Sequence, residues 1–180
     1  KERTIGLGVS TSQLNIEAVE VQRITSGGLV VGSTGTADTK SNKGITVVGL
    51  DATITGTITG TVTLLATVDD SQIVFQTTPS SCYGLAAQAD NGVLVQAQIT
   101  STSTIMHLDG DYENNSTADS SNLVTFAAGQ TISAETLMTI ESTESSIDRA
   151  GALTLKTAEG IIINGDFKAV TSSALVIYAD

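Results

Sequence analysis

The segment from residue 109 to residue 122 concentrates oxygen-bearing side chains. The carboxylates in it that could share one ion are those of Asp109, Asp111, Glu113 and Asp119. Hard cations such as calcium prefer a dense set of oxygen ligands, and acidic positions that alternate in a turn can converge on one ion. Because the spacing lacks the complete EF-hand pattern, the sequence leaves two interpretations open, a calcium site and a solvated acidic loop.

The same segment contains two overlapping glycosylation sequons. Asn114 and Asn115 each begin an N-x-S/T sequence, so either asparagine could accept an N-linked glycan on a eukaryotic secretory route. Sequons also arise by chance, and crowding disfavours modification of both neighbours at once.

Cys82 is the only cysteine, which rules out a disulfide framework within the chain and a cysteine-based metal site. Two interpretations of this residue remain. The thiol could form an intermolecular disulfide with another chain, or it could be a small buried hydrophobe.

The sequence offers no catalytic machinery. His107 is the only histidine, and no G-x-S-x-G elbow accompanies the many serines. Enzymes built on β-helices can gather carboxylates on one face, but the basic residues that such chemistry needs are few and scattered here. We therefore expect no catalytic residues and no enzymatic activity.

The chain is strongly acidic, with 8 Lys+Arg against 19 Asp+Glu and a formal net charge of −11. Such a surface repels phosphate backbones and anionic membranes, so we expect no nucleic-acid partner. Apolar runs such as residues 161–163 are too short to span a bilayer, so we expect no membrane insertion. The acidity is typical of secreted proteins, and the sequence begins at Lys1 without a signal peptide. We therefore expect an extracellular or cell-surface protein, present here as a processed chain or a piece of a longer one.

Short β-branched runs separated by small polar corners recur along the chain. Residues 152–167 show the unit most clearly, with a strand at 153–157, the corner Ala-Glu-Gly, a strand at 161–164, and Gly165-Asp166 closing it. Strict alternation predicts a strand over residues 51–65. Residues 14–24 are also expected to form strands, with a helix as the competing prediction, and residues 79–83 to form an outward loop.

These elements predict one all-β module over residues 1–180. Comparable strands recur every 16 to 23 residues or so, which is typical of a right-handed parallel β-helix, or β-solenoid, of about eight irregular coils. Aliphatic residues fit a narrow layered core, and aromatic residues make up only 3% of the chain. The structural alternative is an immunoglobulin-like β-sandwich, which also uses short strands and frequent turns.

Several phrases resemble the tandem repeats of large secreted β-solenoid proteins of algae, which are similar in style to filamentous-haemagglutinin adhesins. The phrases begin at Arg3, Glu20, Gly28, Thr61 and Ala150 and read RTIGLG, EVQRI, GLVVGS, TVTLLA and AGALTL. The resemblance implies a parallel β-helix used as a fibre, stalk or adhesin, with no catalytic residues to carry over.

Two functions follow as expectations. The first is a structural repeat of an extracellular filament or surface appendage, in which the partner is another copy of the same unit. Residues 174–179 followed by residues 1–8 would repeat the strand–corner–strand pattern, so units could join in a head-to-tail or tandem array. The second is an adhesive or carbohydrate-binding module with its specificity in loops 33–43, 79–83 and 109–122. Few aromatic side chains lie in those loops to stack on sugars, which favours the first.

Overall fold

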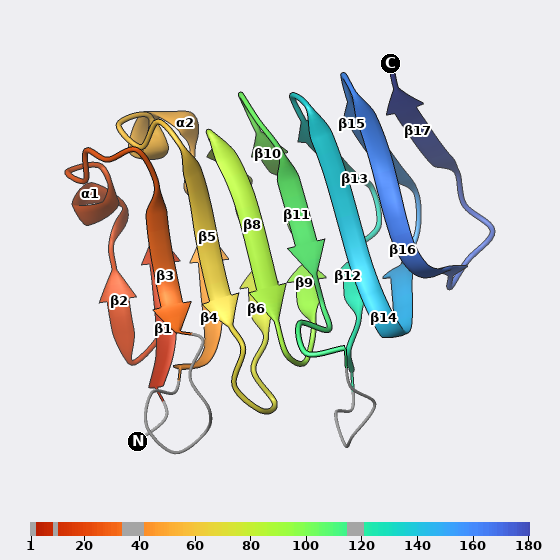
Figure 1. Ribbon diagram of the computed structural model, residues 1–180, viewed down its shortest axis with the longest axis horizontal. Coiled ribbons are helices and arrows are strands. Elements are labelled where there is room, and N and C mark those ends of the chain that lie inside the picture. Colours follow the sequence, from red (N-terminus) through yellow and green to blue (C-terminus); the bar gives the residue numbers. More distant parts are fainter. Residues whose placement is uncertain (1–2, 9–10, 34–41, 115–120) are drawn as a thin grey trace.

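Parallel β-strands form most of the protein (Figure 1), and the computed structural model describes residues 3–8, 11–33, 42–114 and 121–180. Two one-turn helices, α1 (Ala18–Val21) and α2 (Ala52–Thr55), accompany the strands. The strands are β1 (Arg3–Gly8), β2 (Leu14–Ile16), β3 (Leu29–Ser33), β4 (Asn42–Val48), β5 (Thr61–Ala66), β6 (Ile73–Phe75), β7 (Ser80–Cys82), β8 (Gly84–Ala89), β9 (Val93–Val95), β10 (Ile99–Ser101), β11 (Met106–Asp109), β12 (Val124–Phe126), β13 (Gln130–Ala134), β14 (Leu137–Arg149), β15 (Leu153–Thr157), β16 (Gly160–Ala169) and β17 (Leu175–Ala179).

The strands form one strongly curled sheet and one smaller sheet. The curled sheet has two arms that meet in the long strand β14: the first arm runs β3-β5-β8-β11-β14, and the second runs β2-β1-β4-β6-β9-β12-β14. Strand β16 pairs with β14 in both arms, and the smaller sheet has the order β7-β10-β13-β15-β17. All pairs between these strands are parallel, which confirms the all-β prediction and excludes an antiparallel immunoglobulin-like sandwich for the described residues.

The core consists of in-register columns of aliphatic side chains. In the first arm, Leu64 pairs with Ala87, Ala87 with Leu108, and Leu108 with Ile140, and all four are fully buried. Alternate residues along each strand point inward, since the side-chain period of a strand is two. Each inward side chain is therefore covered by its equivalents on the strands at either side.

Residues 14–24, predicted as strands, contain only the short strand β2 and then helix α1. The backbone N–H of Glu17 donates to Oε2 of Glu20 at 2.9 Å, one half of a capping-box arrangement at the start of α1. The strand prediction is therefore wrong for residues 18–21, because local capping outweighs the β character of the neighbouring segments.

The predicted strand over residues 51–65 is also wrong in its first half. Asp51 accepts hydrogen bonds from the backbone N–H groups of Thr53 (2.8 Å) and Ile54 (3.2 Å), so it caps helix α2. Hydrogen bonds from Thr53, its side chain first, hold the pKa of Asp51 below its ordinary value. The alternation of threonines thus continues as a strand only from Thr61, where β5 begins.

Two further boundaries differ from expectation. Residues 79–83, predicted as an outward loop, contain strand β7, in which Ser80 and Cys82 are each 5% exposed. Strand β15 has the predicted bounds, whereas β16 continues through Gly165, where a corner was expected. Gly165 has φ +141°, a region open to glycine, which lets the strand pass from one arm to the other.

The columns of buried side chains predict that a leucine-to-alanine substitution lowers the free energy of unfolding much more within a column than on an edge strand. Leu108→Ala should lower the free energy of unfolding by about 2–5 kcal/mol, because Leu108 is fully buried between two neighbouring strands. Leu14→Ala on edge strand β2 should cost about 0.5 kcal/mol, because Leu14 is 49% exposed. Urea denaturation of both variants measures the difference, and equal costs would contradict this column arrangement.

Candidate functional site

Three of the four predicted calcium ligands lie in the described residues, and their surroundings differ. Asp109 ends β11 and is 6% exposed, Asp111 is fully buried, and Glu113 is exposed to solvent. Asp119 lies outside the described residues. Within the described residues, no group of three or more His, Cys, Asp or Glu side chains is arranged to hold a metal ion. Calcium binding by this loop stays a prediction.

Asp111 ties the loop to the turn of the neighbouring strand. Its Oδ1 accepts from Nδ2 of Asn122 at 3.2 Å, and its Oδ2 accepts from the backbone N–H of Glu144 at 2.8 Å. The hydroxyl of Ser142 donates to the carbonyl of Asn122 at 2.5 Å. The base of the 109–122 loop is thus closed by bonds between buried groups, as buried polar atoms require.

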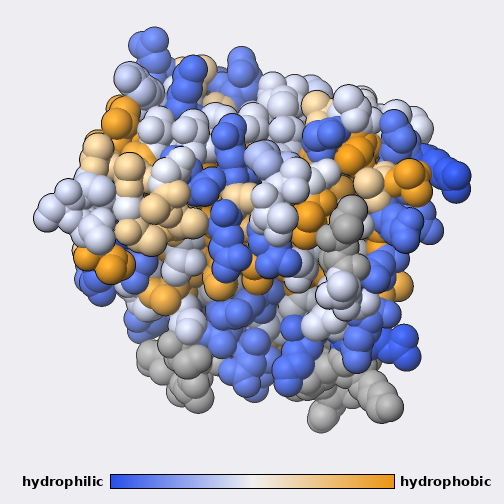
Figure 2. Space-filling view, turned by 180° about the vertical axis from the view of Figure 1, so that it is seen from behind, coloured by the Kyte–Doolittle hydropathy of each residue, from blue (hydrophilic) through white to orange (hydrophobic). Residues whose placement is uncertain are grey.

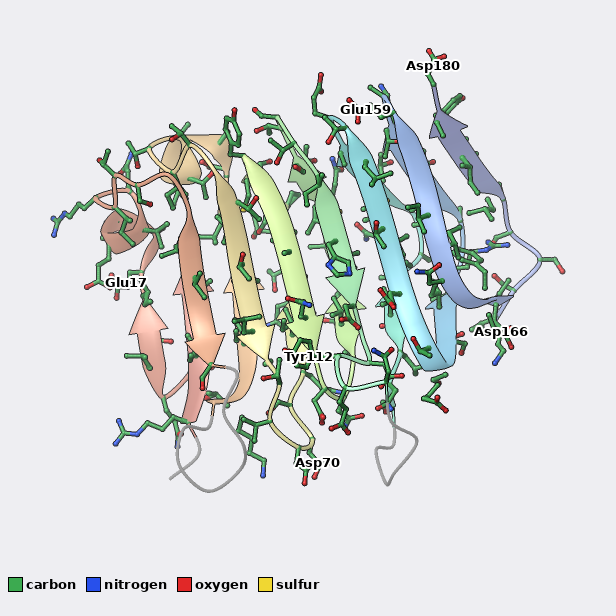
Figure 3. The ribbon with its side chains drawn as sticks, in the orientation of Figure 1. Glu17, Asp70, Tyr112, Glu159, Asp166 and Asp180 are labelled. Atoms are coloured by element: carbon green, nitrogen blue, oxygen red, sulfur yellow. The ribbon has the colours of Figure 1, made fainter. Side chains whose placement is uncertain are left out.

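Equivalent polar groups occupy the preceding turns between the two arms. Oδ2 of Asp90 accepts from the backbone N–H of Asp70 at 2.8 Å, and the backbone N–H of Asn91 donates to the carbonyl of Ser71 at 2.9 Å. Figure 3 shows Asp70 and Tyr112 at the same edge of the molecule, where the arms are joined. This row of turns is stabilised by side-chain-to-backbone bonds that pass from one strand layer to the next.

Asp109 belongs to a second group of side chains, on the outer face of the first arm. It pairs in register with Gln88 on β8 and with Glu141 on β14. Nε2 of His107 lies 3.6 Å from Oε2 of Glu141, and both side chains are about one quarter exposed, at 28% and 27%. This His107–Asp109–Glu141 cluster brings together two carboxylates and the only histidine of the chain.

Burial raises the pKa of Asp109. Desolvation is the main cause and the charge of Glu141 adds to it, while hydrogen bonds from the Asp111 backbone and from Gln88, together with His107, act in the opposite direction. The Oδ1 of Asp109 accepts the Asp111 backbone N–H at 3.1 Å. Asp109 therefore keeps its proton to a higher pH than an exposed aspartate does.

The remaining predicted site residues are separate from this cluster. Asn114 is exposed, with φ +51°, so a glycan could reach it, whereas Asn115 lies outside the described residues. Cys82 is buried on β7 and its thiol is free, and burial raises its pKa to about 12. The burial favours the interpretation of Cys82 as a small hydrophobe over that of an intermolecular disulfide.

Arg149 is a buried polar residue that sequence reasoning missed. It is 8% exposed at the end of β14, and its Nη1 donates to the carbonyl of Gly151 at 2.7 Å and to Oγ of Ser173 at 2.9 Å. The sequence contains one signal of this burial: Arg149 lies two residues after the apolar Ile147, so both side chains point to the same face of the strand. Arg149 joins β14 to the segment before β17, so its role is structural.

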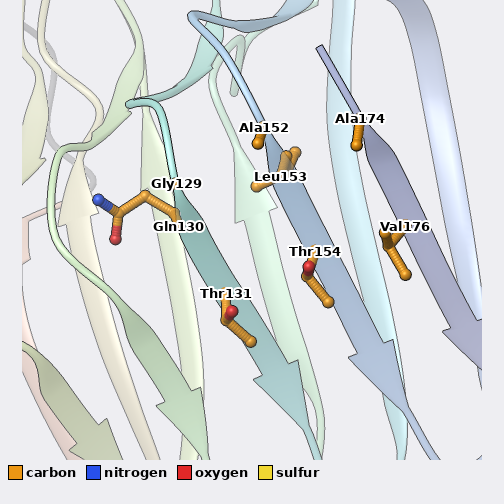
Figure 4. A pocket seen from close by; sticks show the side chains of 8 residues that line it. All are labelled: Gly129, Gln130, Thr131, Ala152, Leu153, Thr154, Ala174 and Val176. Atoms are coloured by element: carbon orange, nitrogen blue, oxygen red, sulfur yellow. The ribbon is translucent and has the colours of Figure 1, made fainter.

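A shallow depression lies on the outer face of the smaller sheet (Figure 4). Its volume is about 100 Å³, well under the roughly 300 Å³ at which small-molecule sites begin. It is lined by Gly129, Gln130, Thr131, Ala152, Leu153, Thr154, Ala174 and Val176. The depression is therefore too small to serve as a ligand pocket.

Comparisons with protein-family models, with curated proteins and with solved structures give no match. Among the described helices, neither has the length and apolar character needed to cross a membrane.

Replacement of Asp111 tests the closing of the loop. Asp111→Ala should destabilise the protein by about 1–3 kcal/mol, because Asn122 and the Glu144 backbone lose a buried acceptor. Asp69→Ala, at an exposed position of an equivalent turn, should change stability by less than about 0.5 kcal/mol. Urea denaturation measures both, and a neutral Asp111→Ala variant would contradict this role.

The raised pKa of Asp109 predicts a pH dependence of stability. Because the folded pKa lies above the unfolded value of 3.8, the native state holds more protons between the two values, so stability falls as pH rises through that window. Asp109→Asn should flatten this fall, while the amide oxygen can still accept the Asp111 N–H. Urea midpoints between pH 3 and 7 measure the slopes, and parallel curves for variant and parent would contradict the assignment.

Proposed function

We propose that the protein is a structural module of an extracellular filament or surface appendage, built as a right-handed parallel β-helix and assembled end to end. It acts through its shape and its ends, with no catalytic step. Three features support the proposal: the parallel pairing in rows, the acidic composition, and the apolar inward positions of β16 and β17, past which the rows can continue into a further strand. Right-handed crossovers are the rule between parallel strands, which supports the handedness.

The apolar inward positions of β16 and β17 are the observation that carries the proposal. Strands β16 and β17 are the last members of their rows in the described chain and lie together at one end of the molecule (Figure 1). On β17, the inward positions Leu175 and Ile177 are 38% and 46% exposed. Their in-register partners on β15, Leu153 and Leu155, are 2% and 0% exposed. A further strand, in the same chain or in another copy, would cover these positions of core type.

Exposed strand edges and open core positions favour association. An edge presents unpaired N–H and C=O groups that another strand can bind, and solenoids need terminal caps to remain soluble. Figure 2 shows apolar side chains at both lateral ends of the molecule and hydrophilic side chains over much of the face between them. Rows that continue past β16 and β17, in a tandem array or in another copy placed head to tail, would therefore bury these apolar side chains.

An adhesive, carbohydrate-binding module is the second candidate. Its support is the exposure of Tyr83 and Tyr112, at 38% and 39%, in two of the turns. Tyrosine presents an apolar ring with a polar hydroxyl, the type of surface that interfaces favour. Retention on immobilised polysaccharide that disappears in a Tyr83→Ala/Tyr112→Ala double variant would favour this candidate over the filament.

Electron microscopy of the purified chain tests the proposed function. We expect elongated particles with an axial repeat, because parallel strand layers add about 4.8 Å each along the stack. Discrete globular particles at all concentrations, with no concentration-dependent growth in light scattering, would contradict the filament.

A further inference from the structure

The outer face of the smaller sheet carries mainly hydroxyl side chains. The outward positions on its three interior strands, β10, β13 and β15, are Thr100, Thr131, Ser133, Thr154 and Lys156. The residues that alternate with them, such as Ile99, Ile132 and Leu155, are fully buried in the core. Each of these three strands has a paired strand on both sides, so these five side chains lie on an outer surface formed within the stack.

Parallel pairing aligns one row of outward side chains across four strands of this face. The row contains, in order from β10 to β17, Thr100, Ser133, Lys156 and Tyr178. The hydroxyl of Ser133 donates to Oγ1 of Thr100 at 3.2 Å. Adjacent strands lie about 4.8 Å apart. A straight ligand laid across the strands therefore meets two hydroxyls, an ammonium group and an aromatic ring in turn.

A second row beside it lines the shallow depression on this face. Figure 4 shows Thr131, Thr154 and Val176 side by side on β13, β15 and β17, where they lie in register. These side chains combine methyl groups with two hydroxyls. The depression is too small to enclose a ligand, but it can receive a substituent of a ligand that lies along the first row.

The smaller sheet also differs from the two arms in charge. Within the bounds of its five strands, no outward position carries a carboxylate, and Lys156 adds a positive charge; Glu135 follows β13 in the next turn. The outward positions of the first arm include Asp109 and Glu141, and those of the second arm include Asp148. Because the chain has a net charge of −11, an anionic ligand is repelled least at the outer face of the smaller sheet.

The side chains of the first row match the groups of an acidic polysaccharide. Hydroxyls of serine and threonine both donate and accept hydrogen bonds, as the hydroxyls of a sugar do. The ring of Tyr178, which is 59% exposed, offers an apolar surface with a polar tip. The ammonium group of Lys156 can bind a carboxylate or a sulfate as a point charge. A pyranose ring with its linkage is about as long as one strand spacing, so successive sugars can follow successive strands.

We propose that the outer face of the smaller sheet binds a linear acidic polysaccharide, laid across the strands along the row Thr100–Ser133–Lys156–Tyr178. The inference rests on the carbohydrate-binding candidate, and it places the contact on a sheet face instead of the turns that contain Tyr83 and Tyr112. It is independent of how the rows end. A further strand beside β17 would pair with its edge and extend this face, because outward side chains stay on the surface.

Affinity electrophoresis in gels that contain a polysaccharide tests the ligand class. The acidic probes are carboxymethyl cellulose, alginate and a sulfated galactan, and hydroxyethyl cellulose is the neutral counterpart of the first. We expect at least one acidic probe to retard the protein, with a smaller effect at high salt. No retardation by any of the three would overturn the proposal. Equal retardation by hydroxyethyl cellulose would overturn the assignment of an acidic ligand.

Charge reversal at Lys156 tests the face. Lys156→Glu should raise the dissociation constant for the retarding polymer about fivefold, because repulsion replaces an exposed ion pair. The matched control is Lys168→Glu, an equally exposed lysine that points outward on the second arm and changes the net charge by the same amount. Lys168→Glu should leave the dissociation constant unchanged. Equal weakening by the two variants would indicate repulsion by the whole molecule and would overturn the proposed face.

Removal of the ring tests the row against the turns. Tyr178→Ala should raise the dissociation constant about fivefold, because the sugar loses its contact with an aromatic ring. The Tyr83→Ala/Tyr112→Ala double variant should bind as the parent does. Loss of binding in the double variant alone would overturn the proposed face in favour of the turns. Urea midpoints close to that of the parent confirm that each variant is folded, as expected for exposed side chains.

The tests separate this inference from the proposed filament. Elongated particles in the microscope without retardation by any acidic polymer would leave the filament standing and remove the polysaccharide-binding face. Retardation that depends on Lys156, by a protein that forms only discrete particles, would support the face and remove the filament.

Discussion

Pairing of each interior strand with an in-register parallel strand on both sides is the constraint on which the rest of the structure depends. A single strand layer is too thin to bury its own inward side chains, so each relies on the layers above and below it. Leu108 is buried because Ala87 and Ile140 lie on either side of it. Stability in such a stack is therefore approximately a sum of contacts between neighbouring strand layers.

The polar turns between the arms also depend on partners in the neighbouring strand layers, but through hydrogen bonds rather than apolar packing. A turn that passes from one arm to the other turns backbone groups inward, and those groups need partners. Asp90 and Asp111 supply them by accepting N–H groups from the neighbouring layers. Acidic residues that look like cation ligands in the sequence therefore also have a structural task, which is to hold adjacent layers together.

The sequence was sufficient for the class of fold and for the best-formed strands. Alternation of inward and outward residues predicts β15 correctly, because that signal is local. The pairing between strands is not local, and spacing alone misassigned it. A recurrence every 16 to 23 residues or so makes Leu29, Ile45 and Val62 successive equivalents, yet Leu29 pairs directly with Val62, while Ile45 lies in the other arm.

The surroundings of the candidate site residues could not be predicted for the same reason. The burial of Asp109 depends on Gln88 and Glu141, which are distant in the sequence and become neighbours only through the register. A capping carboxylate such as Asp51 overrides a strong strand pattern with two short hydrogen bonds, and alternation contains no sign of it. The sequence thus indicates which side chains could do chemistry, but it does not predict which residues surround them in the fold.

The hydrogen bond between Asp111 and Asn122 has a consequence for how this scaffold accepts new sequence. The turn at Asp90-Asn91-Gly92 connects β8 to β9 in three residues, whereas the equivalent turn after β11 runs from Gly110 to Leu123. Asp111 and Asn122 fasten the two ends of that longer turn at its base, so the strand layers meet in the same way in both cases. The scaffold therefore separates the length of a connection from the geometry of its core, and the exposed residues 112–114 form a natural site for inserting and displaying a foreign peptide.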